Sequence, residues 1–176
     1  METKLITAVC LCLIGSGCAG VQKIVTKPAE ASAVLLPTQG SETRGTLRFL
    51  QKADLVVVTG KITGISPGPH GLHIHEKGDC SSPDAMSAGG HFNPTLSPHG
   101  SPTDFGRHAG DLGNVLADAT GVAEFTLEAR GLAVGPESHS VVGRSVIVHA
   151  GEDDLKSQPG GKSGARLACG LIGKSP

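Results

Sequence analysis

Residues 43–62 read TRGTLRFLQKADLVVVTGKI, and this stretch predicts a β-hairpin. Its two halves, 43–51 and 55–62, are short and rich in Leu, Val and Thr, as half-buried strands are. The turn between them reads Gln-Lys-Ala-Asp at 51–54. Six further segments have the same character, at 33–36, 71–75, 112–117, 122–127, 145–149 and 166–172. No stretch shows a sustained helical period, so the sequence predicts an all-β fold, an antiparallel sandwich or barrel of about eight strands.

The composition supports this fold class and excludes several functions. The 176 residues include 26 Gly and 11 Pro, which disfavour a helix bundle, and only four aromatic residues, all Phe. A shortage of aromatic rings argues against a protein that stacks nucleobases. The net charge of −1 gives no general attraction to nucleic acids or anionic membranes, so we expect no nucleic-acid partner.

Two connections between the predicted strands are long, from about residue 76 to 110 and from about 150 to 165. Connections of this length without their own secondary structure are uncommon in compact domains and are usually functional or disordered. The first one carries Cys80, His91, His99 and His108, which are residues able to form cross-links. We therefore expect an ordered, functional loop there.

The histidines predict two metal sites. His73 and His75 lie two residues apart on a predicted strand, so their rings share one face. In the first long connection, His91, His99, His108 and Asp111 supply three imidazoles and a carboxylate, a set that fills a closed zinc site. His149 ends another strand, and with His73, His75 and one shared loop histidine it completes an all-imidazole set, which suits Cu(II).

The N-terminus predicts export. Residues 5–14 are apolar, too short to span a membrane, and follow Lys4 as in a secretory signal. Gly15-Ser16-Gly17-Cys18 resembles a bacterial lipoprotein cleavage site, at which the Cys becomes lipidated. We expect a signal peptide at 1–17, a polar tether at 18–32 and one domain at 33–173, located in the bacterial cell envelope or periplasm and touching the membrane only through a lipid at Cys18. Plain secretion and a buried N-terminal segment are the alternatives.

Cys10 and Cys12 would leave with the signal, and Cys18 would be acylated. Cys80 and Cys169 remain, and two cysteines in an exported domain usually pair. Two free buried thiols are the alternative.

Five segments together resemble one family, the copper/zinc superoxide dismutases. They are GLHIHE at 71–76, AGGHFNP at 88–94, RHAGDLGN at 107–114, GRSVIVH at 143–149 and GARLACG at 164–170. The resemblance covers about residues 33–173. It implies an eight-stranded antiparallel Greek-key β-sandwich or barrel with two long functional loops.

The resemblance also implies roles for individual residues. The copper ligands would be His73, His75, His91 and His149. The zinc ligands would be His91, His99, His108 and Asp111, with His91 bridging both ions. Arg166 would bind the superoxide anion, Cys80 and Cys169 would form a disulfide, and Asp153 would link a copper ligand to a zinc ligand. His70 and His139 would not be ligands. Lys162 would lie near the substrate channel, and Glu152 and Asp154 would either shape its rim or belong to a solvated loop face.

The implied reaction converts two superoxide ions into dioxygen and hydrogen peroxide, with copper and zinc as cofactors and His91 as a proton carrier. The implied assembly is a monomer or a homodimer. A copper/zinc-binding module without turnover and a structural cell-surface domain are the alternatives; the second would not need six histidines and one aspartate at two sites.

Overall fold

The computed structural model describes residues 27–175, so the expected signal peptide, the lipidation at Cys18 and most of the tether lie outside the described residues. Within them, no helix is long and apolar enough to cross a membrane. The elements are β1 Glu30–Pro37, β2 Arg44–Lys52, β3 Leu55–Thr63, β4 Gly68–His75, a short 3-10 helix η1 Met86–Ala88, β5 Asp111–Ala117, β6 Val122–Arg130, β7 Ser145–His149, β8 Arg166–Leu171 and β9 Gly173–Lys174.

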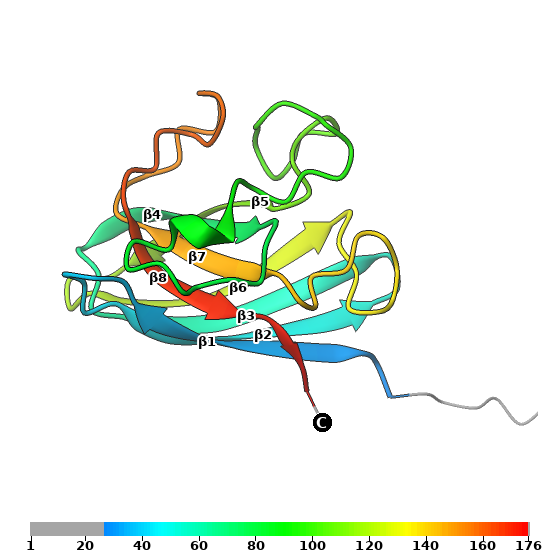
Figure 1. Ribbon diagram of the computed structural model, residues 1–176, viewed down its shortest axis with the longest axis horizontal. Coiled ribbons are helices and arrows are strands. Elements are labelled where there is room, and N and C mark those ends of the chain that lie inside the picture. Colours follow the sequence, from blue (N-terminus) through cyan, green and yellow to red (C-terminus); the bar gives the residue numbers. More distant parts are fainter. Residues whose placement is uncertain (1–26, 176) are drawn as a thin grey trace, which may run out of the picture.

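The strands form an antiparallel, nearly closed barrel with the order β5-β4-β7-β8-β1-β2-β3-β6, and β9 pairs with β1 (Figure 1). The connections from β3 to β4 and from β6 to β7 join strands that are not neighbours in this order, which is the Greek-key arrangement. All eight strands predicted from the sequence are present. The predicted fold class is therefore confirmed.

Three details differ from the sequence prediction. Strand β1 begins at Glu30, so residues 30–32 belong to the sheet and not to a tether, because they pair in register with 48–50 of β2. Strand β4 begins at Gly68, three residues before the predicted start. The first long connection contains η1, which at three residues is too short to leave a periodic signal in the sequence.

The barrel interior follows from the alternation within the strands. Leu47 and Phe49 of β2 and Val56, Val58 and Ile62 of β3 are almost fully buried. Strands β4 and β7 are different, since β7 is buried throughout and β4 is buried from His70 to His75. Their outer faces must therefore be covered as well as their inner faces.

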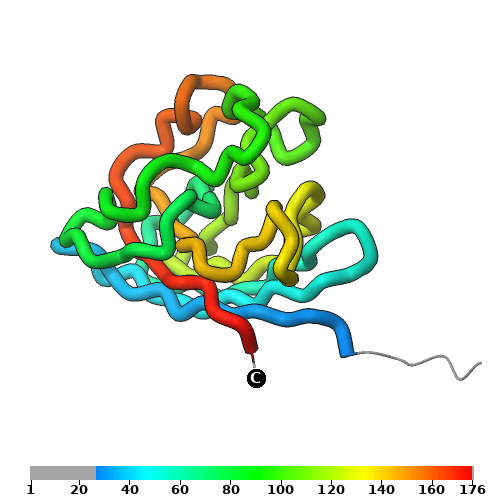
Figure 2. Tube along the Cα trace, turned by 45° about the vertical axis from the view of Figure 1, so that its right-hand side comes forward, coloured from blue at the N-terminus to red at the C-terminus, as the bar shows by residue number. Residues whose placement is uncertain are grey.

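The cover is provided by the two long connections, which lie side by side on one side of the barrel, drawn in green and orange in Figure 2. Strands β4 and β7 are antiparallel neighbours. The loops that follow them therefore leave from opposite ends and both fold back over the shared outer face. This places His73 and His75 beneath the loops, while Leu72 and Ile74 face the barrel interior.

A disulfide fastens the first loop to the barrel. Cys80 is bonded to Cys169 of β8, with the two Cα atoms 5.8 Å apart. Beneath this loop, Ala85 and Ala88 pack with Cys169 and Ile147 in a small apolar cluster. The pairing expected from the sequence is confirmed, and it fixes the segment that carries η1.

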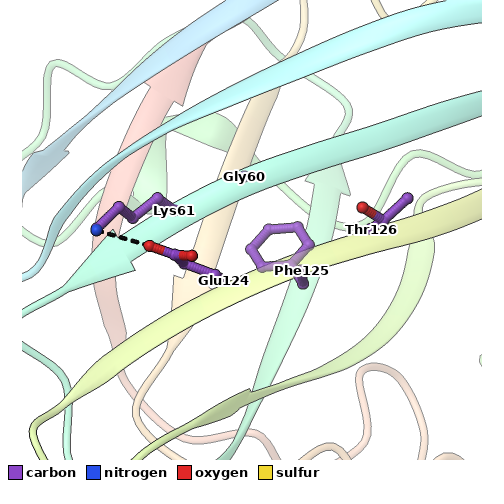
Figure 3. A pocket seen from close by; sticks show the side chains of 5 residues that line it. All are labelled: Gly60, Lys61, Glu124, Phe125 and Thr126. Atoms are coloured by element: carbon purple, nitrogen blue, oxygen red, sulfur yellow. Dashed lines mark ion pairs between the residues drawn. The ribbon is translucent and has the colours of Figure 1, made fainter.

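A hollow on strands β3 and β6 has a structural explanation. In Figure 3, Lys61 and Glu124 face each other across the strands, with Nζ and Oε1 2.6 Å apart. Gly60 pairs with Phe125 in the β3–β6 register, and a Cβ atom at Gly60 would lie only 2.6 Å from Cζ of Phe125. The ring thus covers a position where no side chain fits. Among residues 27–175, none of the predicted site residues lines this hollow.

Candidate metal centre

Two groups of potential metal ligands lie beneath the long loops. The first consists of His73, His75, His91 and His149, and the second of His91, His99, His108 and Asp111. Within each group, the potential ligand atoms all lie within 4.8 Å of one another. The structure therefore brings together all seven residues that the sequence predicted, and His91 is the residue common to both groups.

In the first group, three nitrogen atoms are buried without a hydrogen-bond partner: Nδ1 of His73, Nε2 of His75 and Nε2 of His149. Buried polar atoms are normally satisfied, and leaving several unsatisfied in one place is costly. A cation that accepts their lone pairs would remove this cost. The donor set of neutral imidazoles therefore fits a copper ion.

The opposite nitrogen of each of these rings is held by the protein. Nδ1–H of His75 donates to the carbonyl oxygen of Gly89 at 3.0 Å, and Nδ1–H of His149 donates to that of Gly164 at 3.2 Å. Nε2–H of His73 donates to Oδ2 of Asp153 at 2.8 Å. These bonds fix the orientation and tautomer of the rings, so that each directs an unprotonated nitrogen into the group.

In the second group, three imidazole nitrogens surround one carboxylate oxygen. Oδ1 of Asp111 lies 2.8 Å from Nδ1 of His91, 3.0 Å from Nδ1 of His99 and 3.2 Å from Nδ1 of His108. Nδ1 of His99 makes no hydrogen bond despite this short distance. Two ligands about 2.1 Å from a tetrahedral zinc ion lie about 3.4 Å apart, so the group is close to the size of a zinc site.

The main chain around Asp111 supports its side chain. Oδ2 of Asp111 accepts the backbone N–H groups of Gly100 and His108, each at 3.1 Å. Asp111 is fully buried. With one oxygen bound by the loop and the other facing three imidazoles, the second group leaves no open position. This is the arrangement of a structural zinc site.

Asp153 connects the two groups. Its Oδ2 atom accepts from His73, and its Oδ1 atom lies 2.9 Å from Nε2 of His99, on the other group. Asn114 holds the main chain of Asp153 from both sides, accepting from its N–H at 2.7 Å and donating to its C=O at 2.9 Å. The sequence pointed to Asp153 but not to Asn114, although Asn114 ends one of the recognised motifs.

Burial keeps three imidazoles of the first group neutral, as metal ligation requires. It lowers the pKa of His75 to about 2 and the pKa of His149 to about 3. It also lowers the pKa of His73 to about 4, although the hydrogen bond to Asp153 opposes this shift.

For His99 and Asp111 of the second group, charged neighbours together affect the pKa values more than burial does. Burial lowers the pKa of His99, but the neighbouring carboxylates of Asp111 and Asp153 more than compensate and raise it to about 9. Burial raises the pKa of Asp111, yet the neighbouring imidazoles of His91 and His99 hold that pKa far below the usual range. Negative charge is thus concentrated at the second group, which favours a bound cation there.

An open cleft of about 430 Å³ leads to the first group, lined among others by His75, His91, His149, Lys162 and Arg166. Nη1 and Nη2 of Arg166 each donate at 2.7 Å, to the carbonyl oxygens of Ala85 and Gly89 respectively. Both acceptors flank η1, in the loop that the Cys80–Cys169 disulfide fastens. The guanidinium is therefore fixed beside the histidines and can bind an anion there.

The remaining candidates occupy other positions. Lys162 lines the cleft, whereas Glu152 is exposed and does not line it. Asp154 does not line the cleft either; its Oδ1 atom accepts from the N–H groups of Lys156 and Ser157, because it caps a turn within the second loop.

His70 and His139 belong to neither group. His70 is buried, and its ring nitrogens bond to the carbonyl oxygens of His149 and Ser66, at 2.8 Å each. It therefore supports the end of β7, as a structural hydrogen-bonding residue would.

Removing zinc gives a test of this geometry. We expect the backbone amides of Gly100 and His108 to exchange with solvent at least about tenfold faster in zinc-free protein, because Asp111 then loses the cation that orders it. The amides of β2 and β3 are expected to keep their protection. Hydrogen exchange measured residue by residue checks this, and equal protection across the loop and the strands in the zinc-free protein would contradict it.

Comparisons with known proteins agree with this geometry. Residues 43–172 match the family described as copper/zinc superoxide dismutase. The chain is 40% identical over 162 residues to an extracellular superoxide dismutase [Cu-Zn] of Brugia pahangi, covering 86% of this chain and 79% of the relative. It is 45% identical over 148 residues to superoxide dismutase [Cu-Zn] 2 of Mesembryanthemum crystallinum, covering 80% of this chain and 94% of the relative.

A third relative is named for a different function. The copper chaperone for superoxide dismutase of Rattus norvegicus is 45% identical over 151 residues, which is 82% of this chain but 53% of the chaperone, so this chain spans about half its length. The family match covers most of the chain and includes both ligand groups. The chain belongs to the copper/zinc superoxide dismutase family.

Proposed function

We propose that this protein is an oxidoreductase that converts two superoxide ions and two protons into dioxygen and hydrogen peroxide. The observation that carries the proposal is the position of Arg166, which lies in the wall of a cleft that leads to an all-histidine ligand group. That group shares His91 with a second, closed group. With copper bound, this site would combine a redox centre, an anion-binding charge and a proton carrier.

The residues proposed to hold copper are His73, His75, His91 and His149, and those proposed to hold zinc are His91, His99, His108 and Asp111. When bound, copper would supply a one-electron redox couple, and zinc would supply a fixed positive charge. The unpartnered buried nitrogens of His73, His75, His99 and His149 support this assignment.

Arg166 has the role of binding and orienting the anion. Its guanidinium stays protonated at any ordinary pH, although burial lowers its pKa. Because two of its nitrogens are bound to main-chain carbonyl groups, the side chain is already ordered when the anion arrives. One of the three remaining guanidinium N–H groups can then donate to a superoxide oxygen.

His91 has the role of carrying a proton. Its Nδ1 atom faces Asp111, while its ring lines the cleft through which solvent reaches the site. Glycine at 160 keeps Nε2 of His91 accessible, since a Cβ atom there would lie 3.0 Å from this nitrogen. Nε2 can therefore receive a proton from solvent and deliver it to a reduced substrate in the cleft.

A copper/zinc-binding module without turnover is the second candidate, and the match to copper chaperones favours it. The complete ligand set and Arg166 favour the enzyme. Superoxide consumption by protein loaded with copper and zinc separates the two. The enzyme is expected to exceed an equal concentration of free copper, whereas a rate equal to that of free copper would leave only the binding module.

We further propose that the protein acts outside the cytoplasm. The disulfide and the extracellular relative from Brugia pahangi support this location. The finer proposal, a lipid anchor on Cys18 in a bacterial envelope after removal of residues 1–17, is tested by mass spectrometry of the mature N-terminus. A mature chain that retains residues 1–17, or begins elsewhere without a lipid, would overturn it.

A further inference from the structure

Gln158 binds the main chain of one proposed zinc ligand from both sides. The N–H group of His99 donates to Oε1 of Gln158 at 2.7 Å, and Nε2 of Gln158 donates to the carbonyl oxygen of His99 at 2.9 Å. A third bond, from Nε2 to the carbonyl oxygen of Lys156 at 3.1 Å, fixes the amide within its own loop. The Gln158 side chain thus satisfies both main-chain hydrogen-bonding groups of His99, as the main chain of a neighbouring β-strand would.

The ring of His99 is held by the same loop. Its Nε2 atom lies 2.9 Å from Oδ1 of Asp153, which is five residues before Gln158. His99 is almost completely buried, at 4% exposure. The loop that follows β7 therefore determines both the ring position and the main-chain position of His99.

The residues next to Gln158 form one wall of the cleft. Pro159, Gly160 and Lys162 line it. Gly160 lies against Nε2 of His91, and Gly161 lies so close to the carboxylate of Asp153 that no Cβ atom fits. Any shift of this segment would move the cleft wall and the zinc-side histidine together.

We propose that Gln158 is a positioning residue that couples zinc retention at His99 to the order of the cleft wall. The inference rests on the proposed zinc site. Gln158 itself lines the cleft, but its side-chain hydrogen bonds go to main-chain groups and to none of the proposed ligand atoms, so it acts through the main chain of His99. Without the side-chain amide of Gln158, His99 can move away from Asp111, and the segment 159–164 loses its attachment to the first loop.

The test replaces the amide by an apolar side chain of similar length, in Gln158→Met. Gln51 provides a matched control, because its amide also binds only main-chain groups: it accepts from Val134 at 2.9 Å and donates to Ala53 and Leu55 at 2.9 and 3.2 Å. None of these partners belongs to either ligand group. Gln51→Met therefore removes the same chemistry from a different part of the barrel.

Two readouts are used, neither of which is enzyme activity. The first is the rate at which zinc-loaded protein releases zinc to a chelating indicator. It is expected to rise roughly 5- to 150-fold in Gln158→Met, as the loss of two backbone hydrogen bonds predicts, and to stay unchanged in Gln51→Met. The second is hydrogen exchange at the amides of His99 and of residues 160–164. These amides are expected to lose protection in Gln158→Met even with zinc bound.

Gln158→Glu keeps the oxygen that accepts from His99 and removes both N–H donors. It is expected to retain protection at the His99 amide, and it takes the place of Gln158→Met if that variant does not fold. Equal zinc release in wild-type and Gln158→Met, or an equal rise in Gln158→Met and Gln51→Met, would overturn the inference. If wild-type protein retains no zinc, the proposed zinc site fails, while protection of the His99 amide still decides whether Gln158 holds the loop.

Discussion

Replacing Arg166 by isoleucine is expected to lower kcat/KM for superoxide by roughly 10- to 150-fold while the copper and zinc contents remain unchanged. A hydrogen bond to a charged group contributes about 1.5–3 kcal/mol, which corresponds to a factor of this size in a rate or equilibrium constant. Isoleucine occupies space in the cleft wall but offers neither charge nor donor. The carbonyl groups of Ala85 and Gly89 would lose the guanidinium donors but keep their bonds from the N–H of Ala88 and from Nδ1 of His75.

Two further variants make this result specific. Arg166→Lys keeps the positive charge but cannot donate to both carbonyl groups and to the anion in the same fixed geometry, so its kcat/KM is expected to lie between those of wild type and Arg166→Ile. Arg48→Ile removes the same charge at a surface ion pair with Glu30, away from the cleft, and is expected to retain wild-type kcat/KM. A fully active Arg166→Ile variant would mean that the cleft does not bind the substrate through this residue.

Replacing His91 by alanine is expected to have the largest effect of any single substitution. It removes one donor from both ligand groups, whereas each other ligand belongs to one group only. Substituting a residue that only supports a ligand typically lowers metal affinity or activity about 10- to 100-fold, so removal of the shared ligand is expected to cost more. Activity should fall below that of Arg166→Ile, and zinc should be retained more weakly.

His108→Ala is the matched comparison, since it removes one imidazole from the zinc group and leaves the copper group complete. With Cu(II) in both sites, electron paramagnetic resonance should show coupled ions in wild type and two independent signals in His91→Ala. Unchanged spectra and activity in His91→Ala would contradict a shared ligand.

The strands and the ligand residues could be predicted from sequence because they depend on local patterns. A two-residue period places His73 and His75 on one face, and the five motifs contain the remaining ligands except His99, which lies between two of them. Burial of that face was not evident, since it depends on how two loops far apart in the sequence fold over β4 and β7. The start of β1 at Glu30 likewise depends on pairing with β2, not on the composition of residues 30–32.

The residues that support the ligands were harder to predict. Gly89 and Gly164 hold imidazoles through carbonyl oxygens, and every residue has such an oxygen. Asn114 and Gln158 act through side-chain amides that bind the main chain of a distant loop, at separations of 39 and 59 residues. For Asp154 the sequence left a role at the channel rim and a solvated loop face open, and in the structure its carboxylate caps a turn.

The most direct test of the account is anomalous X-ray scattering, measured at the copper and zinc absorption edges on crystals of fully metallated protein. The account predicts one copper ion among His73, His75, His91 and His149, and one zinc ion among His91, His99, His108 and Asp111, on opposite sides of the His91 ring. A single ion, or two ions that do not share His91, would contradict it.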